Sequence, residues 1–159
     1  MAAPGDVGDM DRRTLLGTVS LLAVGGCAGP PAEPSPAEPS PDEPLRLSDA
    51  SIRDTGRCDD PETASVDVSA SRVRVTGCVT GPNGCSIASF GSATVEGSRL
   101  VVVVTTRRDA PPEVSCTEAL VPRGYVATVD LSSGRPRSVR VIHDAAGGRE
   151  RVADVAVDS

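Results

Sequence analysis

Short segments of alternating apolar and polar residues, separated by turn-forming residues, run through the chain from Leu45 onward. Val66–Val68 and Val73–Val75 each alternate with a period of two, as half-buried strands do, and a turn is predicted between them at 69–72. Leu100–Val104 is a continuous apolar run, which indicates a central strand covered on both faces. Further strands are predicted at 93–95, 125–131, 138–142 and 149–157. No part of this region has the 3.6-residue period of an amphipathic helix.

About seven short strands between Leu45 and Ser159 predict a single all-β domain, an antiparallel β-sandwich that is immunoglobulin-like in its general architecture. Ser132–Pro136 is predicted to join two of the strands as a hairpin, and Leu45–Glu62 is predicted to be a loose leading segment. The chain has one Phe, one Tyr and no Trp, so its core must be built from Val, Ile, Leu and Ala. Such a core needs a further source of stability.

A proline-rich segment at 28–44 precedes this domain, and within it Ala32–Pro36 is repeated as Ala37–Pro41. Proline fixes φ and removes a backbone donor, so the segment favours extended polyproline II over helix or sheet. At roughly 3.1 Å per residue it would lift the domain well clear of a surface. We interpret it as a spacer rather than as a proline-rich recognition motif.

The N-terminal segment has the three zones of an export signal. Arg12 and Arg13 are followed by an apolar stretch at 15–24 and then by small residues that end at Cys27. The apolar stretch is far shorter than the ~20 residues that span a bilayer. We therefore expect residues 1–26 to be removed, with either Met1 or Met10 as the true start.

Two motifs in this segment resemble those of exported lipoproteins. Asp11–Gly17 is similar to the twin-arginine export motif, with Leu15 at the position where that motif has an aromatic residue or leucine. Val24–Cys27 resembles a lipobox, although Val24 replaces its usual leucine. The resemblance implies a diacylglyceryl group on the sulfur of Cys27, which would become the new N-terminus. It divides the chain into a signal peptide (1–26), a lipidated cysteine with its linker (27–44) and a disulfide-stapled β domain (45–159), exported and held on the outer face of the cytoplasmic membrane.

The net charge and the basic residues of the chain indicate which classes of partner it could bind. The chain has a net charge of −6, and all 16 of its basic residues are arginine. Without a clustered basic face it does not fit nucleic-acid binding. An acidic chain without lysine suits high salt, where screening acts over ~3 Å. Together with the export motifs, this composition resembles that of haloarchaeal surface lipoproteins. Uncharacterised haloarchaeal secreted proteins have a similar succession of cysteines and strands, which carries no implied activity and includes Thr76–Cys78, Asn83–Cys85, Leu100–Val103, Cys116–Val121, Tyr125, Pro136 and Val139–Asp144.

Four cysteines follow Cys27, and an even number in an exported domain predicts two disulfides. Of the three possible connectivities we favour Cys58 with Cys78 and Cys85 with Cys116, because a Cys78–Cys85 bond would constrain only a loop that its turn already closes. The other pairings remain open. The chain has no Cys-x-x-Cys pair, so structural zinc and thiol redox chemistry are disfavoured.

His143 is the only histidine, which excludes a blue-copper site because that site needs two. We interpret His143 as a strand-end histidine beside a solvated aspartate, Asp144, rather than as a general base. Asp59, Asp60 and Glu62 are interpreted as a solvated loop rather than as calcium ligands. No catalytic residue, metal or cofactor is predicted.

Two functional hypotheses remain. The first is a non-enzymatic module, anchored to the membrane, that binds a protein, an envelope component or a small ligand through loops at the ends of the sandwich. The alternative is an extracellular hydrolase or metal-dependent enzyme that uses His143 and nearby carboxylates. A concave pocket holding His143 and two or more carboxylates would favour the enzyme, whereas a histidine on an open strand end would not.

Overall fold

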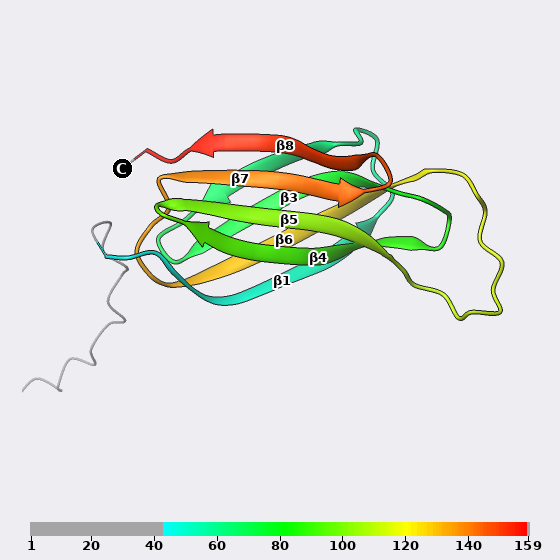
Figure 1. Cartoon of the computed structure of the whole chain (residues 1–159), viewed down its shortest axis with the longest axis horizontal. Coiled ribbons are helices and arrows are strands. Elements are labelled where there is room, and N and C mark those ends of the chain that lie inside the picture. Colours follow the sequence, from blue (N-terminus) through cyan, green and yellow to red (C-terminus); the bar gives the residue numbers. More distant parts are fainter. Residues whose placement is uncertain (1–42, 159) are drawn as a thin grey trace, which may run out of the picture. The chain divides into compact units, whose positions relative to one another are not determined.

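The computed structural model describes residues 43–158, which form a sandwich of two four-stranded sheets (Figure 1). The first sheet has the order β1-β6-β3-β2, with strands β1 (Arg46–Gly56), β6 (Val121–Ser133), β3 (Arg72–Gly81) and β2 (Thr63–Val68). The second has the order β4-β5-β7-β8, with strands β4 (Ser86–Glu96), β5 (Arg99–Arg108), β7 (Ser138–Ala145) and β8 (Gly148–Ala156). The all-β sandwich predicted from the sequence is confirmed. Arg12, Arg13, Cys27 and the repeat at 32–41 lie outside the described residues.

The alternating segments form strands where the pattern predicts them. β2 and β3 pair as an antiparallel hairpin, and the backbone NH of Ser69 donates to the carbonyl of Arg72 (2.8 Å) in the predicted turn. β4 and β5 pair in the same way across a turn in which Gly97 has a φ of +63°. The five residues of Leu100–Val104 are all buried, as expected for a strand covered on both faces.

The leading segment is not loose, and residues 43–158 contain eight strands rather than the predicted seven or so. β1 pairs antiparallel with β6 along its length. The sequence pattern concealed β1 because its register shifts between Leu47 and Asp49. This irregularity separates Leu47 from Ala50 and Ile52 by an odd number of residues, although all three pack against the core. A strict period of two therefore does not detect it.

The predicted hairpin at Ser132–Pro136 is also wrong. β6 and β7 belong to different sheets, so this connection carries the chain from one layer to the other. Gly134, with a φ of +68°, and the buried Pro136 fix the connection. β7 then pairs parallel with β5, and the sandwich is consequently not antiparallel throughout.

The core lies between the sheets and is almost entirely aliphatic. Its fully buried side chains come from alternate positions of four strands and include Val73, Val75, Val79, Leu100, Val102, Val104, Val129, Val139 and Val141. Burying each large aliphatic side chain contributes about 1.5–3 kcal/mol. Phe90 packs only at the edge of this cluster, whereas Tyr125 is completely buried.

Two disulfides reinforce the core with the pairing favoured from the sequence. Cys58–Cys78 joins the loop after β1 to β3, with the Cα atoms 6.0 Å apart. Cys85–Cys116 joins the β3–β4 turn to the β5–β6 loop, with the Cα atoms 5.5 Å apart. Disulfides of this kind persist in oxidising compartments. The two bonds therefore indicate an oxidising environment outside the cytoplasm.

Candidate functional site

The sandwich has two ends with different loops. The loop end carries the β3–β4 turn (82–85) and the β5–β6 loop (109–120), whereas the linker end carries the β4–β5 turn (97–98), the β6–β7 connection (134–137) and the start of β1. β6 runs from one end to the other, because its first residues pair with the end of β1 and its last residues with the start of β1. In Figure 1 the long yellow-green β5–β6 loop projects on the right, opposite the cyan start of the domain.

The β3–β4 turn is built around Asn83. The side-chain Oδ1 of Asn83 accepts from the backbone NH of Cys85 (3.1 Å) and from the hydroxyl of Ser86 (3.2 Å). A Cβ at Gly81 would lie 2.3 Å from that of Ser86, so only glycine fits beneath this buried serine. The turn therefore presents Cys85 in a fixed position.

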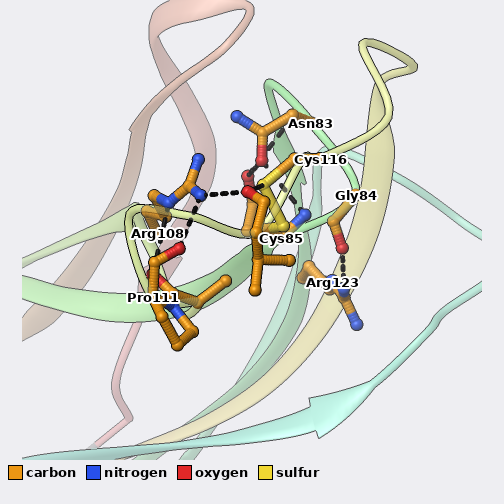
Figure 2. The surroundings of a disulfide bond; sticks show 10 residues. Asn83, Gly84, Cys85, Arg108, Pro111, Cys116 and Arg123 are labelled. Carbon is orange, nitrogen blue, oxygen red and sulfur yellow. Dashed lines mark hydrogen bonds between the residues drawn. A yellow bond between two sulfur atoms is a disulfide. The ribbon is translucent and has the colours of Figure 1, made fainter.

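The β5–β6 loop is attached to this turn at several points (Figure 2). Besides the Cys85–Cys116 disulfide, the backbone NH of Gly84 donates to the carbonyl of Thr117 (3.0 Å). At the start of the loop, the NH of Asp109 donates to the carbonyl of Cys85 (2.8 Å). Two segments far apart in the sequence thus form one surface.

Arg108 organises the interior of the loop, as Figure 2 shows. Its guanidinium donates to the carbonyls of Ala110 (3.2 Å), Pro111 (2.9 Å) and Val114 (2.6 Å). On the other side of the disulfide, Arg123 donates to the carbonyl of Gly84 (3.1 Å). Arginine has five donors in a rigid fork, which suits this bridging of several carbonyls. The loop is consequently ordered by polar contacts rather than by an apolar core of its own.

The same loop exposes apolar side chains. Val114 is 44% exposed and Leu120 is 66% exposed, and the intervening residues are mostly exposed as well. Single exposed aliphatic residues are common on protein surfaces. Here, however, two of them lie on a loop that a disulfide and an arginine hold in one conformation. No sequence pattern indicates the role of Arg108, because its acceptors are backbone carbonyls.

A second polar cluster lies inside the loop end. His143 lies near the end of β7, as predicted, but it is 1% exposed and does not stand on an open strand end. Its Nε2 lies 2.8 Å from the hydroxyl of Tyr125, and its Nδ1 lies 2.7 Å from Oε2 of Glu62. His143 occupies an inward position of β7 and faces Tyr125 of β6 across the sandwich, with the rings edge to face. Asp144 is exposed as predicted and pairs with Arg149.

Glu62 holds this cluster together. Its Oε1 accepts from the backbone NH of Thr80 (2.9 Å), while its backbone has a φ of +56°, a left-handed conformation that is costly for a residue other than glycine. Glu62 turns inward to His143, so it does not form a carboxylate group with Asp59 and Asp60. Within residues 43–158, no group of three His, Cys, Asp or Glu side chains is arranged to hold a metal ion.

The pKa values of Glu62, His143 and Tyr125 show which of these side chains carries a proton at neutral pH. Burial raises the pKa of the Glu62 carboxyl, but hydrogen bonds from Thr80 and His143 outweigh it, so the pKa lies below its usual value. Burial lowers the pKa of His143, and the Glu62 carboxylate only partly opposes this. Burial and the charge of Glu62 together raise the pKa of Tyr125. At neutral pH the Nδ1–H of a neutral His143 therefore donates to Glu62, and the Tyr125 hydroxyl donates to Nε2.

This arrangement cross-links the two sheets, and of its three side chains that of Glu62 alone is partly exposed. Tyr125 and His143 are both enclosed, and the one carboxylate hydrogen-bonded to His143 is Glu62. The cavity of about 520 Å³ over β7 and β8 is lined by Ile142 and charged residues and not by His143. The sequence did not indicate this cluster, because its members come from three separate segments. The one available signal was Tyr125, since a buried tyrosine needs a partner for its hydroxyl.

Within residues 43–158, no helix has the length and apolar character needed to cross a bilayer. Comparisons with the models of known protein families, with curated protein sequences and with solved structures find no match for this chain.

Proposed function

We propose that this protein is an exported lipoprotein, held at the outer face of the cytoplasmic membrane through a lipid on Cys27. Its β domain is a non-catalytic module that binds a protein or another envelope component through the loop end. The observation that carries this proposal is the β5–β6 loop, in which Val114 and Leu120 are exposed on a segment fixed by Cys85–Cys116.

The main support for a binding function is that the β5–β6 loop is ordered although most of its residues are exposed. Fixing the backbone of one residue costs roughly 1–2 kcal/mol, and an exposed loop recovers little of this through apolar contacts. Here the disulfide and the three carbonyl contacts of Arg108 supply the order instead. A loop ordered before binding loses less entropy when a partner docks. Exposed aliphatic residues on such a loop favour contact with another macromolecule.

The arrangement of the two ends is consistent with a tether. The chain that follows Cys27 joins the domain at the linker end, and the β5–β6 loop projects from the loop end. A proline-rich spacer between the lipid and the domain would hold the loop end available to partners outside the membrane. The disulfides support the exported location.

The alternative enzyme hypothesis depended on His143 and nearby carboxylates. His143 is enclosed and hydrogen-bonds to Glu62 and to Tyr125, so no observation among the described residues favours that hypothesis.

Affinity capture from native membranes tests the binding surface. The double variant Val114→Ser with Leu120→Ser removes the exposed aliphatic side chains of the loop and should lose the partner that the wild type retains. Val126→Ser is the matched control, because Val126 is a partly exposed residue on the outer face of β6. Equal capture by the wild type and the double variant would contradict the proposed surface.

A further inference from the structure

Residues 115–120 of the β5–β6 loop form a mostly exposed segment that is fixed on both sides. On the side of β5, the disulfide between Cys85 and Cys116 holds it to the β3–β4 turn (Figure 2). On the side of β6, Val121 pairs with Gly81 of β3. The chain between these points therefore bridges two fixed positions of the sandwich.

The backbone of this segment is open to a partner. From 115 to 118 the chain makes no turn and no bend. Within residues 43–158, the amides of Ser115, Cys116 and Glu118 donate to no backbone carbonyl. An extended segment with unpaired backbone amides can pair as a strand with another chain.

The side chains of the segment are divided between the scaffold and solvent. The carbonyl of Thr117 accepts from the backbone NH of Gly84 (3.0 Å), and its Oγ1 fills the space that a Cβ at Gly84 would need. The next residue, Glu118, is exposed, and its carboxylate has no hydrogen bond or ion pair within residues 43–158. Leu120, two positions later, is 66% exposed. The segment thus presents a free carboxylate followed by an aliphatic side chain.

Endopeptidases recognise segments with these properties. Their clefts pair with the backbone of an extended chain, and one pocket takes the side chain that precedes the cleaved bond. A mobile exposed loop is cut in such a cleft. A segment that is ordered before docking loses less entropy on binding, and anchors on both sides of the bond oppose the separation of its ends. Such a segment fits the cleft as an inhibitor rather than as a substrate.

We propose that residues 115–120 occupy the active-site cleft of an endopeptidase that cleaves after acidic residues, and that the protein inhibits this enzyme. Glu118 enters the cationic pocket that precedes the scissile position, and Leu120 contacts the enzyme beyond it. The peptide bond between Glu118 and Ala119 stays intact, so no covalent step is involved. This inference rests on the proposed binding role of the loop end, for which it names the class of partner, and it does not depend on the membrane anchor.

The test uses the full chain carrying Cys27→Ser, so that no acyl group is needed. The protein is titrated into a glutamate-specific serine endopeptidase and, separately, into trypsin, each with a small chromogenic substrate. We expect competitive inhibition of the glutamate-specific enzyme alone. Glu118→Arg should weaken this inhibition at least about thirtyfold, as loss of one buried charged contact predicts, and should create inhibition of trypsin, whose pocket binds arginine.

Two further variants separate an inserted side chain from a general attraction of charges. Glu113→Arg makes the same change of charge in the same loop but before the extended segment, so it should inhibit like the wild type. Cys85→Ser with Cys116→Ser frees one side of the segment and should convert the inhibitor into a substrate. Mass spectrometry of the mixtures should find this variant cleaved after Glu118 and the wild type intact.

The inference would be overturned if the wild type failed to inhibit the glutamate-specific enzyme and Glu118→Arg failed to inhibit trypsin. Equal weakening by Glu113→Arg and Glu118→Arg would also overturn it, as would cleavage of the wild type at the rate of the variant without the disulfide. None of these results decides the proposed function. Capture of a membrane partner that the double variant Val114→Ser with Leu120→Ser loses would then show that the loop end binds a protein of another class.

Discussion

One carboxylate, that of Glu62, orients the ring of His143, while burial is the main cause that keeps His143 and Tyr125 neutral. It accepts the Nδ1–H of His143, which in turn leaves Nε2 free to accept from Tyr125. All three groups depend on each other, because removing one partner leaves a buried polar atom unpaired. We expect Tyr125→Phe to lower the free energy of unfolding by about 1–3 kcal/mol, since Nε2 of His143 would lose its donor. Urea unfolding measures this, and no loss of stability would contradict the hydrogen bond.

The same cluster makes stability depend on pH. The pKa of His143 is lowered in the folded protein, so the unfolded chain binds a proton first and the His143 contribution is present above pH 6.5 and is lost as the pH falls below it. The pKa of Glu62 is also lowered, so its contribution is lost as the pH falls below 4.5. Both effects lower the free energy of unfolding as the pH falls, so the folded protein should become less stable on acidification.

NMR titration of the imidazole is the direct check of this pH dependence. His143 is the only histidine in the chain, so its ring signals can be assigned without ambiguity. We expect an apparent pKa below 6.5 in the folded protein, and Glu62→Gln should change it. A value at or above 6.5 would show that burial does not dominate at this site.

Gly77 makes room for this cluster. A Cβ at Gly77 would lie 2.5 Å from the carbonyl oxygen of Thr63 and 2.5 Å from the hydroxyl of Tyr125. Gly77→Ala should therefore displace Tyr125 and lower the free energy of unfolding by about 1–3 kcal/mol, as overpacking does. Gly147→Ala is a matched control, because nothing lies within 4 Å of the added methyl group. Equal stability of the two variants in urea would contradict this packing.

The two disulfides stabilise different parts of the fold. Cys58–Cys78 includes a cysteine that is 3% exposed and anchors the loop carrying Glu62, whereas Cys85–Cys116 holds the β5–β6 loop. In the chain-entropy model, loops of this size give about 3–4 kcal/mol for each bond. The bonds thus compensate for a core with few aromatic residues.

Removing the second bond should therefore affect one loop. We expect Cys85→Ser with Cys116→Ser to lower the free energy of unfolding by up to about 4 kcal/mol and to increase amide exchange at 109–120 more than in the strands. Hydrogen exchange followed by mass spectrometry measures the difference. Uniform loss of protection across all strands would show that the bond supports the whole core and not mainly the loop.

The elements also show what the sequence could predict. Regular alternation identified β2, β3 and β7, and the apolar run identified β5, because in these strands one side-chain period persists along the whole segment. β1 was missed because its irregular register breaks that period. The crossing between β6 and β7 was missed because a turn sequence does not specify which sheet the next strand joins. The cysteine pairing could be predicted from the sequence because loop closure favours it. The contact of Glu62 with His143 could not be predicted, because only the folded chain brings these two residues together.

We expect the whole protein to be tethered to the membrane through Cys27. Cys27→Ser removes the sulfur that would be alkylated, so the protein should move from the membrane fraction to the medium or remain as an unprocessed precursor. Arg12→Lys with Arg13→Lys keeps the charge but removes the guanidinium forks, and it should block export by a twin-arginine route. Fractionation and intact mass measure both effects. Normal export of the double-lysine variant would favour a general secretory route.

The proposed function requires the anchored domain to contact its partner with the loop end. Site-specific photocrosslinking in native membranes tests it most directly, with a photoreactive side chain placed at Leu120 in one protein and at Arg74, on the outer face of β3, in another. We expect a discrete crosslinked adduct from position 120 that is absent from position 74 and is lost in the double variant Cys85→Ser with Cys116→Ser. Adducts of equal yield from both positions, or an adduct from position 74 alone, would contradict the proposed function.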